Sequence, residues 1–406
     1  MGFQVSPGVQ VKEIDLTNVI PAVSTSIGAI AGAFQWGPVD EIVTVGSEKG
    51  LVDVFGVPNT ETAKFFMPAA SFLRYGQSLR VVRASSGHLN ATSTGTGLLV
   101  KNSDHYTSVS IPATTTWLGR FPGVLGNSLS VAMVGANSTA WGAWGTTYKA
   151  QFDTIPGTSP YTLAQGGIDD EMHIVVIDEA GAWTGQAGTI LETFAYVSQA
   201  SDAKSADGTD NYYKNVINTS SKYIHFGQHE ATLASSKVGQ TAAGTTFTFP
   251  NALTDRSLSG GTDDNILTQA EQQIAYDFFG DAETVDINLL IGGEPPTDSV
   301  NAAVGFSQHL IDIANSRKDC VAFISPLPSL TVNNSSAAAN VITFANLLSS
   351  TSYAVLDSGA LYVYDKYNDV YHWIVASGAI AGLCAKTDAE ADPWFSPAGF
   401  NRGQLL

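Results

Sequence analysis

The stretch VDINLLIGGEPPTDSVNAAVGFSQHLIDIANSRKDCVAFIS, residues 285–325, decides the predicted fold. It begins with a continuous apolar run at residues 285–291, continues through a helical pattern at 298–315 and ends in a second apolar run at 320–325. Continuous hydrophobic strands separated by helices are typical of a largely parallel sheet with helices on both faces. The stretch therefore predicts an α/β core.

The same alternation extends to both sides of this stretch. Further strand-like runs lie at residues 26–34, 41–45, 79–84, 353–356 and 361–364. Helical patterns lie at residues 48–55, between the N-cap Ser47 and Gly56, from Asn59 or Thr60 to Tyr75, and at 337–348. We therefore expect residues 21–85 and 266–406 to form two parts of one α/β core.

The last 42 residues, DKYNDVYHWIVASGAIAGLCAKTDAEADPWFSPAGFNRGQLL, combine aromatic residues with a small-residue helix pattern. We expect them to close the α/β core. The aromatic residues are expected to be core and docking residues rather than a ligand box; they are Tyr367, Tyr371, Trp373 and Trp394.

The middle of the chain has a different composition. Residues 86–118 are rich in Ser and Thr and predict a small insertion with two short strands, at 97–101 and 106–111. Residues 119–265 predict a β-rich region with strands at 128–134 and 172–178 and a short helix near 190–197. The 406-residue chain is thus an α/β, mixed α+β, multidomain protein with a β-rich middle domain.

Residues 1–20 predict an extended arm. Val9, Val11 and Ile14 alternate nearly regularly with polar residues. Such a segment has too little apolar content to fold alone, so it either docks on its own sheet or is donated to the edge of a neighbour's sheet.

Composition limits the classes of function. Only 14% of the residues are charged, 44% are hydrophobic, and the net charge is −18. An acidic chain does not attract nucleic acid or an anionic membrane, and no apolar run is long enough to span a bilayer. A surface so poor in charge fits a protein that packs against copies of itself, although a large enzyme fits as well. Cys320 and Cys384 lie in apolar segments and are expected to be buried, reduced thiols of a cytoplasmic fold.

Motifs for a cofactor or a metal are not found in the sequence. Gly95-Thr96-Gly97 does not continue into a dinucleotide fingerprint. His225 and His229 lack the helical zinc arrangement, and the acidic loops at 207–211 and 260–265 lack the ligand spacing of a calcium loop. We therefore predict no cofactor and no metal.

Two charged groups remain as candidates for function. Asp169, Asp170 and Glu171 form a carboxylate cluster of the kind that a carbohydrate-active hydrolase uses, although three adjacent carboxylates do not converge on one point by themselves and a solvated loop explains them better. The basic residues Arg74, Arg80 and Arg83 are candidates for contacts with acidic patches on an identical neighbour, with intramolecular ion pairs as the alternative.

Several blocks of the sequence, in collinear order, resemble one protein family. They are SPGVQVKEID, GAIAGAFQWGPVDEIVTV, LVDVFGVPNTETAKFFMPAASFLRYGQSLRVVRA, FPGVLGN, ETFAYVSQASDAKSADGTDNYYKNVINTSSKYI, LSGGTDDN, DKYNDVYHWIVASGAIAGLCAKTD and WFSPAGFNRGQLL. Together they are similar to the tail sheath proteins of contractile-tailed bacteriophages of the T4-like group.

The resemblance implies a structural protein without catalysis. Copies would form stacked six-fold rings around a tail tube and contract to drive the tube through the host envelope, with the tube, baseplate and tail terminator proteins as further partners. It also implies a virion location, assembly in the host cytoplasm and a non-catalytic core of subtilisin-like fold, although no Ser/His/Asp set is placed as a triad here. The sheath of a phage-derived contractile injection system is the alternative.

Two departures from the family pattern are expected to matter. Only about thirty Ser/Thr-rich residues precede FPGVLGN, so the outer domain of the family is expected to be reduced. The C-terminal domain that contacts the tube in the family is expected to be absent after residue 406.

Overall fold

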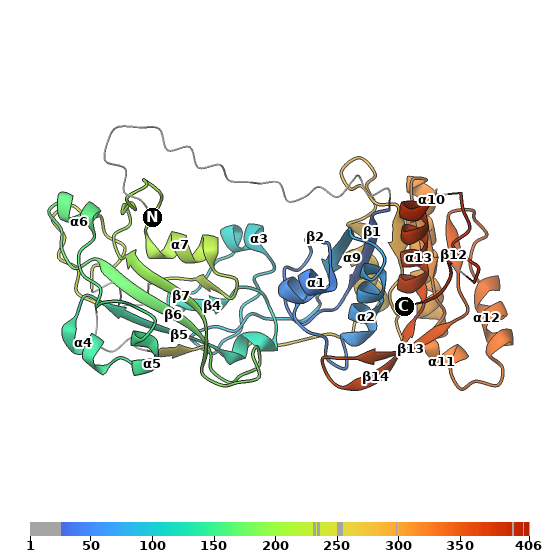
Figure 1. Cartoon of the computed structure of the whole chain (residues 1–406), viewed down its shortest axis with the longest axis horizontal. Helices are drawn as coiled ribbons and strands as arrows, with labels where there is room; N and C mark the ends of the chain where they lie inside the picture. The colour runs from blue at the N-terminus through green and yellow to red at the C-terminus, as the bar shows by residue number, and fades with distance from the viewer. Residues whose placement is uncertain are drawn as a thin grey trace.

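The computed structural model describes residues 26–229, 233, 236–249, 255–297, 299–391, 394–400 and 402–405. The described chain is elongated and consists of two lobes that lie end to end (Figure 1). One lobe contains residues 26–84 together with the last third of the chain, and the other contains the segment between them. The predicted arm with Val9, Val11 and Ile14 lies outside the described residues.

The first lobe is built on a mainly parallel sheet. Its strands are β1 (Gly28–Gly32), β2 (Ile42–Val45), β3 (Leu79–Arg83), β10 (Leu289–Ile291), β11 (Val321–Ile324) and β12 (Ala354–Leu356). They lie in the order β12-β11-β10-β1-β3-β2, and β2 is antiparallel to its neighbour whereas the other pairs are parallel. β1 lies near the centre of the sheet and all of its residues are buried. The predicted α/β core is confirmed.

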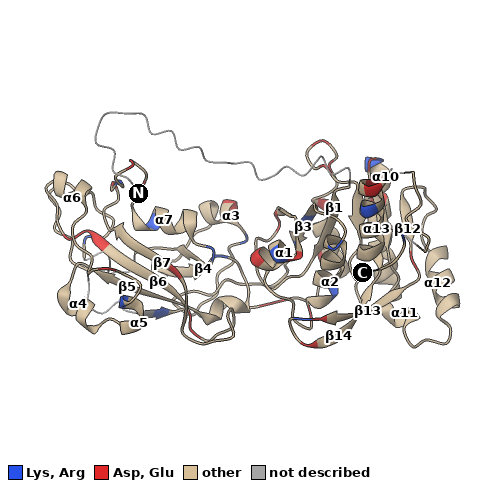
Figure 2. Ribbon diagram, viewed as in Figure 1, with Lys and Arg blue, Asp and Glu red and all other residues tan. Residues whose placement is uncertain are grey.

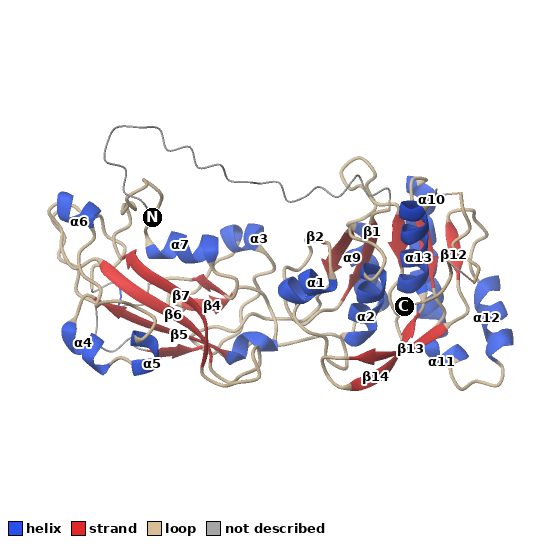
Figure 3. Ribbon diagram, in the orientation of Figure 1, coloured by secondary structure: helices blue, strands red, loops and turns tan. Residues whose placement is uncertain are grey.

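Helices cover both faces of this sheet (Figure 3). They are α1 (Glu48–Phe55), α2 (Ala63–Leu73), α9 (Gln269–Asp277), α10 (Val300–Arg317), α11 (Pro328–Thr331), α12 (Ala337–Asn346) and α13 (Ser377–Glu390). The connection from β1 to β3 leads toward the β2 edge of the sheet, and the connection from β10 to β11 leads toward the β12 edge. Because both crossovers are right-handed, they place α2 and α10 on opposite faces of the sheet. α13 packs beside α2, and α9 packs beside α10.

The small residues of α13 allow its close contact with α2. Gly378 lies against the backbone of Pro68, and Gly382 lies against the ring of Tyr75. Any larger side chain at Gly378 would overlap the Pro68 carbonyl group. The small-residue pattern predicted from the sequence is therefore the contact surface between these two helices.

A two-stranded hairpin precedes α13. Its strands β13 (Ala360–Asp365) and β14 (Val370–Val375) are antiparallel, with Ala360 opposite Val375. The buried carboxylate of Asp365 accepts hydrogen bonds from the backbone N–H of Tyr367, at 2.9 Å, and from the side chain of Asn368, at 2.7 Å. These bonds hold the turn between the strands.

The second lobe is β-rich, as predicted. Its main sheet has the order β7-β6-β5-β9, with β5 (Leu129–Gly135), β6 (Glu171–Asp178), β7 (Thr189–Ser198) and β9 (Asp255–Ser257). A second sheet pairs β4 (Trp117–Gly119) with β8 (Ile224–Phe226). Short helices surround them: α3 (Ser103–Ser108), the 3-10 helix η1 (Val124–Ser128), α4 (Ser138–Ala143), α5 (Thr146–Lys149), α6 (Pro160–Ala164) and α7 (Tyr213–Ser220).

Two predicted elements of this lobe are wrong. The helix expected near 190–197 is the strand β7, whose pairing with β6 contains two register shifts. Such irregularities break the two-residue alternation, so the apolar residues fall at spacings that resemble a helix. The strand expected at 106–111 is largely replaced by α3, which begins after Asn102, whose side chain accepts a hydrogen bond from the backbone N–H of His105.

The Ser/Thr-rich segment 86–118 is part of this lobe. Its residue Trp117 packs on Phe226 and Tyr213, with ring centroids 5.3 and 6.4 Å apart. The strand expected at 97–101 contains a single bridge, from Leu98 to Asn90. The domain boundaries drawn from the sequence remain a prediction.

Candidate functional site

The three arginines chosen from the sequence point in different directions. Arg80 and Arg83 are three residues apart on β3, and an odd spacing places their side chains on opposite faces of a strand. Arg83 is fully buried, whereas Arg80 is half-buried and donates a hydrogen bond to Thr44 Oγ1 at 2.5 Å. Arg74 is exposed just after α2. The three residues do not form one basic patch, and their contact with another subunit stays a prediction.

Arg83 holds the junction between the lobes. Its guanidinium donates hydrogen bonds to the carbonyl oxygens of Gly37, at 2.9 Å, and Gln35, at 3.4 Å. Burial lowers the pKa of Arg83 to about 9, and the charge of Asp263 opposes this shift. Between the two carbonyls lies Trp36, which inserts into the other lobe and contacts Trp183 with ring centroids 4.9 Å apart. The buried arginine therefore fixes the loop that connects the two cores.

The carboxylate cluster does not converge on one point. Asp170 is fully buried and accepts hydrogen bonds from Ser159 N and Oγ, both at 2.8 Å, and from Ser198 Oγ. Glu171 lines a surface hollow of about 500 Å³, and burial raises the pKa of its carboxyl. Because a general acid–base pair needs two carboxylates facing one substrate, Asp170 has a structural role and gives no support to the hydrolase alternative.

The histidines and the acidic loops have local structural roles. His225 is buried and stacks on Tyr106, whereas His229 Nε2 lies 3.3 Å from the hydroxyl of Tyr212. Asp263 Oδ1 accepts a hydrogen bond from Val124 N at 2.8 Å. In the part of the chain that the structure describes, no group of three or more His, Cys, Asp or Glu residues is placed to hold a metal ion.

Both cysteines are free thiols, as the sequence predicted. Cys320 is buried as expected, whereas Cys384, which was also expected to be buried, is half-buried. Burial raises the pKa of each thiol to about 11, so both are protonated at neutral pH.

An aromatic face lies on the hairpin and was only partly anticipated. Tyr362, Tyr364, Tyr371 and Trp373 share one side of β13 and β14, and each is 45–58% exposed. Their rings contact one another, with centroids 4.9 to 5.2 Å apart. By contrast, Tyr367 packs on Phe66 and donates a hydrogen bond to Glu48. The sequence marked Tyr367, Tyr371, Trp373 and Trp394 as core and docking aromatics. The structure places Tyr367 against the core and leaves the other three exposed.

An uncharged face lies at the β12 edge of the sheet, and sequence reasoning missed it. It comprises α12, the following loop and β12, where Ile342, Leu347 and Val355 are 61%, 54% and 42% exposed. Between α12 and β12 lies a groove of about 380 Å³ whose lining residues are all uncharged. Figure 2 shows α11 and α12 without charged residues, and the charge-free run at residues 320–356 was the available signal.

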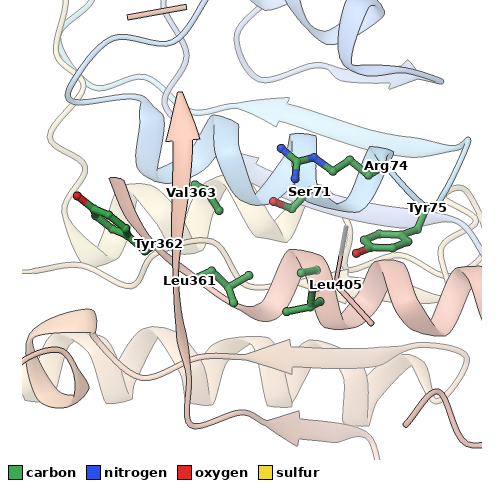
Figure 4. Close-up of a pocket in the computed structure, with 8 residues that line it drawn as sticks. Ser71, Arg74, Tyr75, Leu361, Tyr362, Val363 and Leu405 are labelled. Atoms are coloured by element: carbon green, nitrogen blue, oxygen red, sulfur yellow. The ribbon is translucent and has the colours of Figure 1, made fainter. Parts of the chain in front are cut away.

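A small hollow of about 190 Å³ connects α2 with the hairpin. Ser71 reaches it from α2, Arg74 and Tyr75 from the residues just after α2, and Leu361 and Val363 from β13 (Figure 4). Leu405 also lines the hollow, so the last described residues lie close to the hairpin.

The chain is similar to known proteins over almost its whole length. Residues 25–84 match the family model described as the tail sheath protein Gp18 domain III N-terminal region. The tail sheath protein of Enterobacteria phage T4 is 28% identical over 99% of this chain and 75% of its own length. The predicted resemblance to phage tail sheath proteins is confirmed. The tail sheath proteins of Vibrio phage KVP40 and Salmonella phage ViI are also 28% identical and match 98% and 99% of the chain, or 76% and 73% of their own lengths.

Two solved structures of sheath proteins align with most of the chain. The sheath tail protein from Listeria innocua aligns with a TM-score of 0.46 and 11% identity over 90% of the chain. The sheath tail protein from Desulfitobacterium hafniense aligns with a TM-score of 0.43 and 12% identity over 89%. The chain spans 56% and 58% of the lengths of these two proteins. Among the described residues, no helix is long and apolar enough to cross a membrane.

Proposed function

We propose that the chain is a structural subunit of the contractile tail sheath of a bacteriophage. The observation that carries this proposal is the similarity to three phage tail sheath proteins, which extends over 98–99% of the chain. In this role the protein has no catalytic reaction to perform. Copies assemble in the host cytoplasm into stacked six-fold rings around the tail tube, become part of the virion, and meet the baseplate and tail terminator proteins at the two ends.

The work of contraction comes from contacts between subunits rather than from a bound nucleotide. A sheath that is better packed in its short form than in its long form releases free energy when a signal from the baseplate lets it change. Each subunit then has to move largely as a rigid body. The buried Arg83, which holds the loop that carries Trp36 into the other lobe, supports such rigid movement.

Immunogold electron microscopy tests the proposal. Antibodies raised against the 406-residue chain are applied to particles produced from the genome that encodes it. We expect gold along the whole tail of extended particles, and along the shortened outer cylinder but not the emerging tube after contraction. Label confined to the capsid, the baseplate or the tube would overturn the proposal. Label on contractile particles without a capsid would assign the chain to an injection system instead.

A further inference from the structure

The uncharged face is unusual for a surface in contact with water. No residue from 320 to 356 is charged, although the chain as a whole carries a net charge of −18. Part of this run is the buried strand β11, but most of α12 is accessible and Phe344 is its buried residue. An exposed helix of a soluble monomer normally carries charged residues on its outer side, whereas the centres of protein interfaces are depleted of charge. The composition therefore points to a surface that is covered in the working protein.

The aromatic face has the complementary chemistry. Tyr and Trp provide large contact areas at a small cost in side-chain entropy and are enriched where interfaces are strongest. The rings of Tyr362, Tyr371 and Trp373 are already ordered by their mutual contacts. The groove between α12 and β12 offers them the half-buried apolar residues Leu348 and Leu356 and the exposed residues Ser349 and Ser350. Tyrosine hydroxyl groups need partners of this kind when they are buried.

The two faces do not cover each other within one chain. Ile342 remains 61% exposed and Tyr371 57% exposed. The short helix α11 contacts both α12 and β14 and lies between the two faces (Figure 1). Two different patches on one molecule pair head to tail, and such a contact propagates from copy to copy into a ring or a helix.

We propose that the aromatic face of one copy docks on the uncharged face of the next copy. This inference rests on the proposed function, because it names the surface through which sheath subunits associate. A second copy fits better than a partner of opposite charge, since two chains of net charge −18 approach each other at least cost where one of the two surfaces carries no charge. The aromatic face has one carboxylate beside it, that of Asp369, which accepts a hydrogen bond from the hydroxyl of Tyr364 at 2.8 Å. A nucleic acid gains no counter-charge from either face, and a strongly basic protein gains none from the uncharged face.

Chemical cross-linking tests the contact between two variants that each carry one added cysteine besides the native Cys320 and Cys384. Leu347→Cys places a thiol at the end of α12, and Tyr364→Cys places one at the end of the aromatic face while the other three rings remain. With a short flexible bismaleimide, we expect a covalent dimer in the mixture of the two variants and little in either variant alone. A dimer of Leu347→Cys with itself would show a symmetric contact and overturn the head-to-tail arrangement. A dimer yield in the mixture no higher than that of the parent chain would overturn it as well.

Matched controls separate a specific contact from random collision. Leu163→Cys lies on α6 in the other lobe with an exposure of 63%, so its mixture with Tyr364→Cys should give no more dimer than the parent. Adding Ile342→Glu to the Leu347→Cys partner should lower the dimer yield by about tenfold, because an unpaired charge would be buried in the contact. An unchanged yield would contradict the proposal.

The outcomes for the contact and for the proposed function are independent. If gold labels the tail but the two variants do not cross-link, the chain is a sheath subunit that associates through other surfaces. If the variants cross-link and the tail is not labelled, the head-to-tail contact stands and the proposed function fails.

Discussion

The imidazole of His225 lies flat on the phenol ring of Tyr106, with ring centroids 4.4 Å apart and the ring planes inclined by 13°. The histidine is 1% exposed, and both of its ring nitrogens are buried without a hydrogen-bond partner. Burial, together with the nearby charge of Arg120, lowers the pKa of His225 to about 3 from an ordinary value of 6.5. The second lobe therefore contains an imidazole that folding keeps neutral.

We predict that this histidine makes the second lobe sensitive to acid. The unfolded chain binds the proton more readily than the folded chain does. His225 therefore leaves the free energy of unfolding unchanged above pH 6.5 and lowers it as the pH falls toward about 3. The loss is about 1.4 kcal/mol for each pH unit in this window. His225→Phe keeps a stacked ring and removes the titration. Urea unfolding, followed by the fluorescence of tryptophans including Trp117, should show a smaller loss of stability at pH 4 in the variant. If the free energy of unfolding falls with pH equally in the parent and the variant, His225 is not the source of the acid sensitivity.

The α/β lobe contains a carboxyl group whose effect on stability changes with pH in the opposite direction. Burial raises the pKa of Asp357 to about 6 from 3.8, although Ser325 Oγ and Gly359 N donate hydrogen bonds to its oxygens. The folded chain binds this proton more tightly, so stability falls as the pH rises from about 4 to about 6 and is constant above. Asp357→Asn should remove this slope. The check is a pair of denaturation series between pH 4 and pH 7, and a variant that keeps the slope would exclude Asp357 as its source.

The contact between α2 and α13 has no room for a side chain at Gly378. A Cβ there would overlap the backbone of Pro68, which cannot turn away as a flexible side chain does. We expect Gly378→Ala to lower the free energy of unfolding by about 1 to 3 kcal/mol, the usual cost of overpacking. Thermal unfolding measures the change.

Gly142 provides the matched control for this substitution. It also lies inside a helix, α4, but no atom lies within 4 Å of the position of its Cβ. Gly142→Ala should leave stability unchanged or raise it by about 0.5 to 1 kcal/mol, because alanine restricts the unfolded chain. Equal losses in the two variants would mean that helix geometry, rather than the contact with Pro68, is responsible.

Local signals explain which parts of the fold the sequence predicts well. α1 begins after Ser47 and ends before Gly56 as expected, because the cap at Ser47 and the positive φ of 76° at Gly56 depend on single residues. β7 was missed because its register shifts are set by the pairing with β6, which is far more distant in the sequence than a helical turn.

The candidate site also combines features that single residues determine with features that depend on contacts distant in the sequence. The charges of Arg80 and Arg83 are visible in the sequence, but the face on which each side chain lies is set by the sheet. The aromatic residues of the hairpin were noticed, whereas the uncharged face was not, because its signal is a missing residue type rather than a motif. Whether a surface is exposed is decided by packing in three dimensions.

The last prediction concerns Arg83 and the rigidity of the junction. Arg83→Met keeps most of the side-chain volume but leaves the carbonyl oxygens of Gln35 and Gly37 without their charged donor. We expect a loss of about 3 kcal/mol of stability, since buried hydrogen bonds to charged groups are costly to break. Arg80→Met, on the other face of β3, removes a half-buried bond to Thr44 and should cost less than about 1 kcal/mol. Limited proteolysis should also cut the Arg83 variant first between the lobes, near residues 84–92 or 258–266. If both variants resist proteolysis equally, the packing of Trp36 on Trp183 holds the lobes together without the arginine.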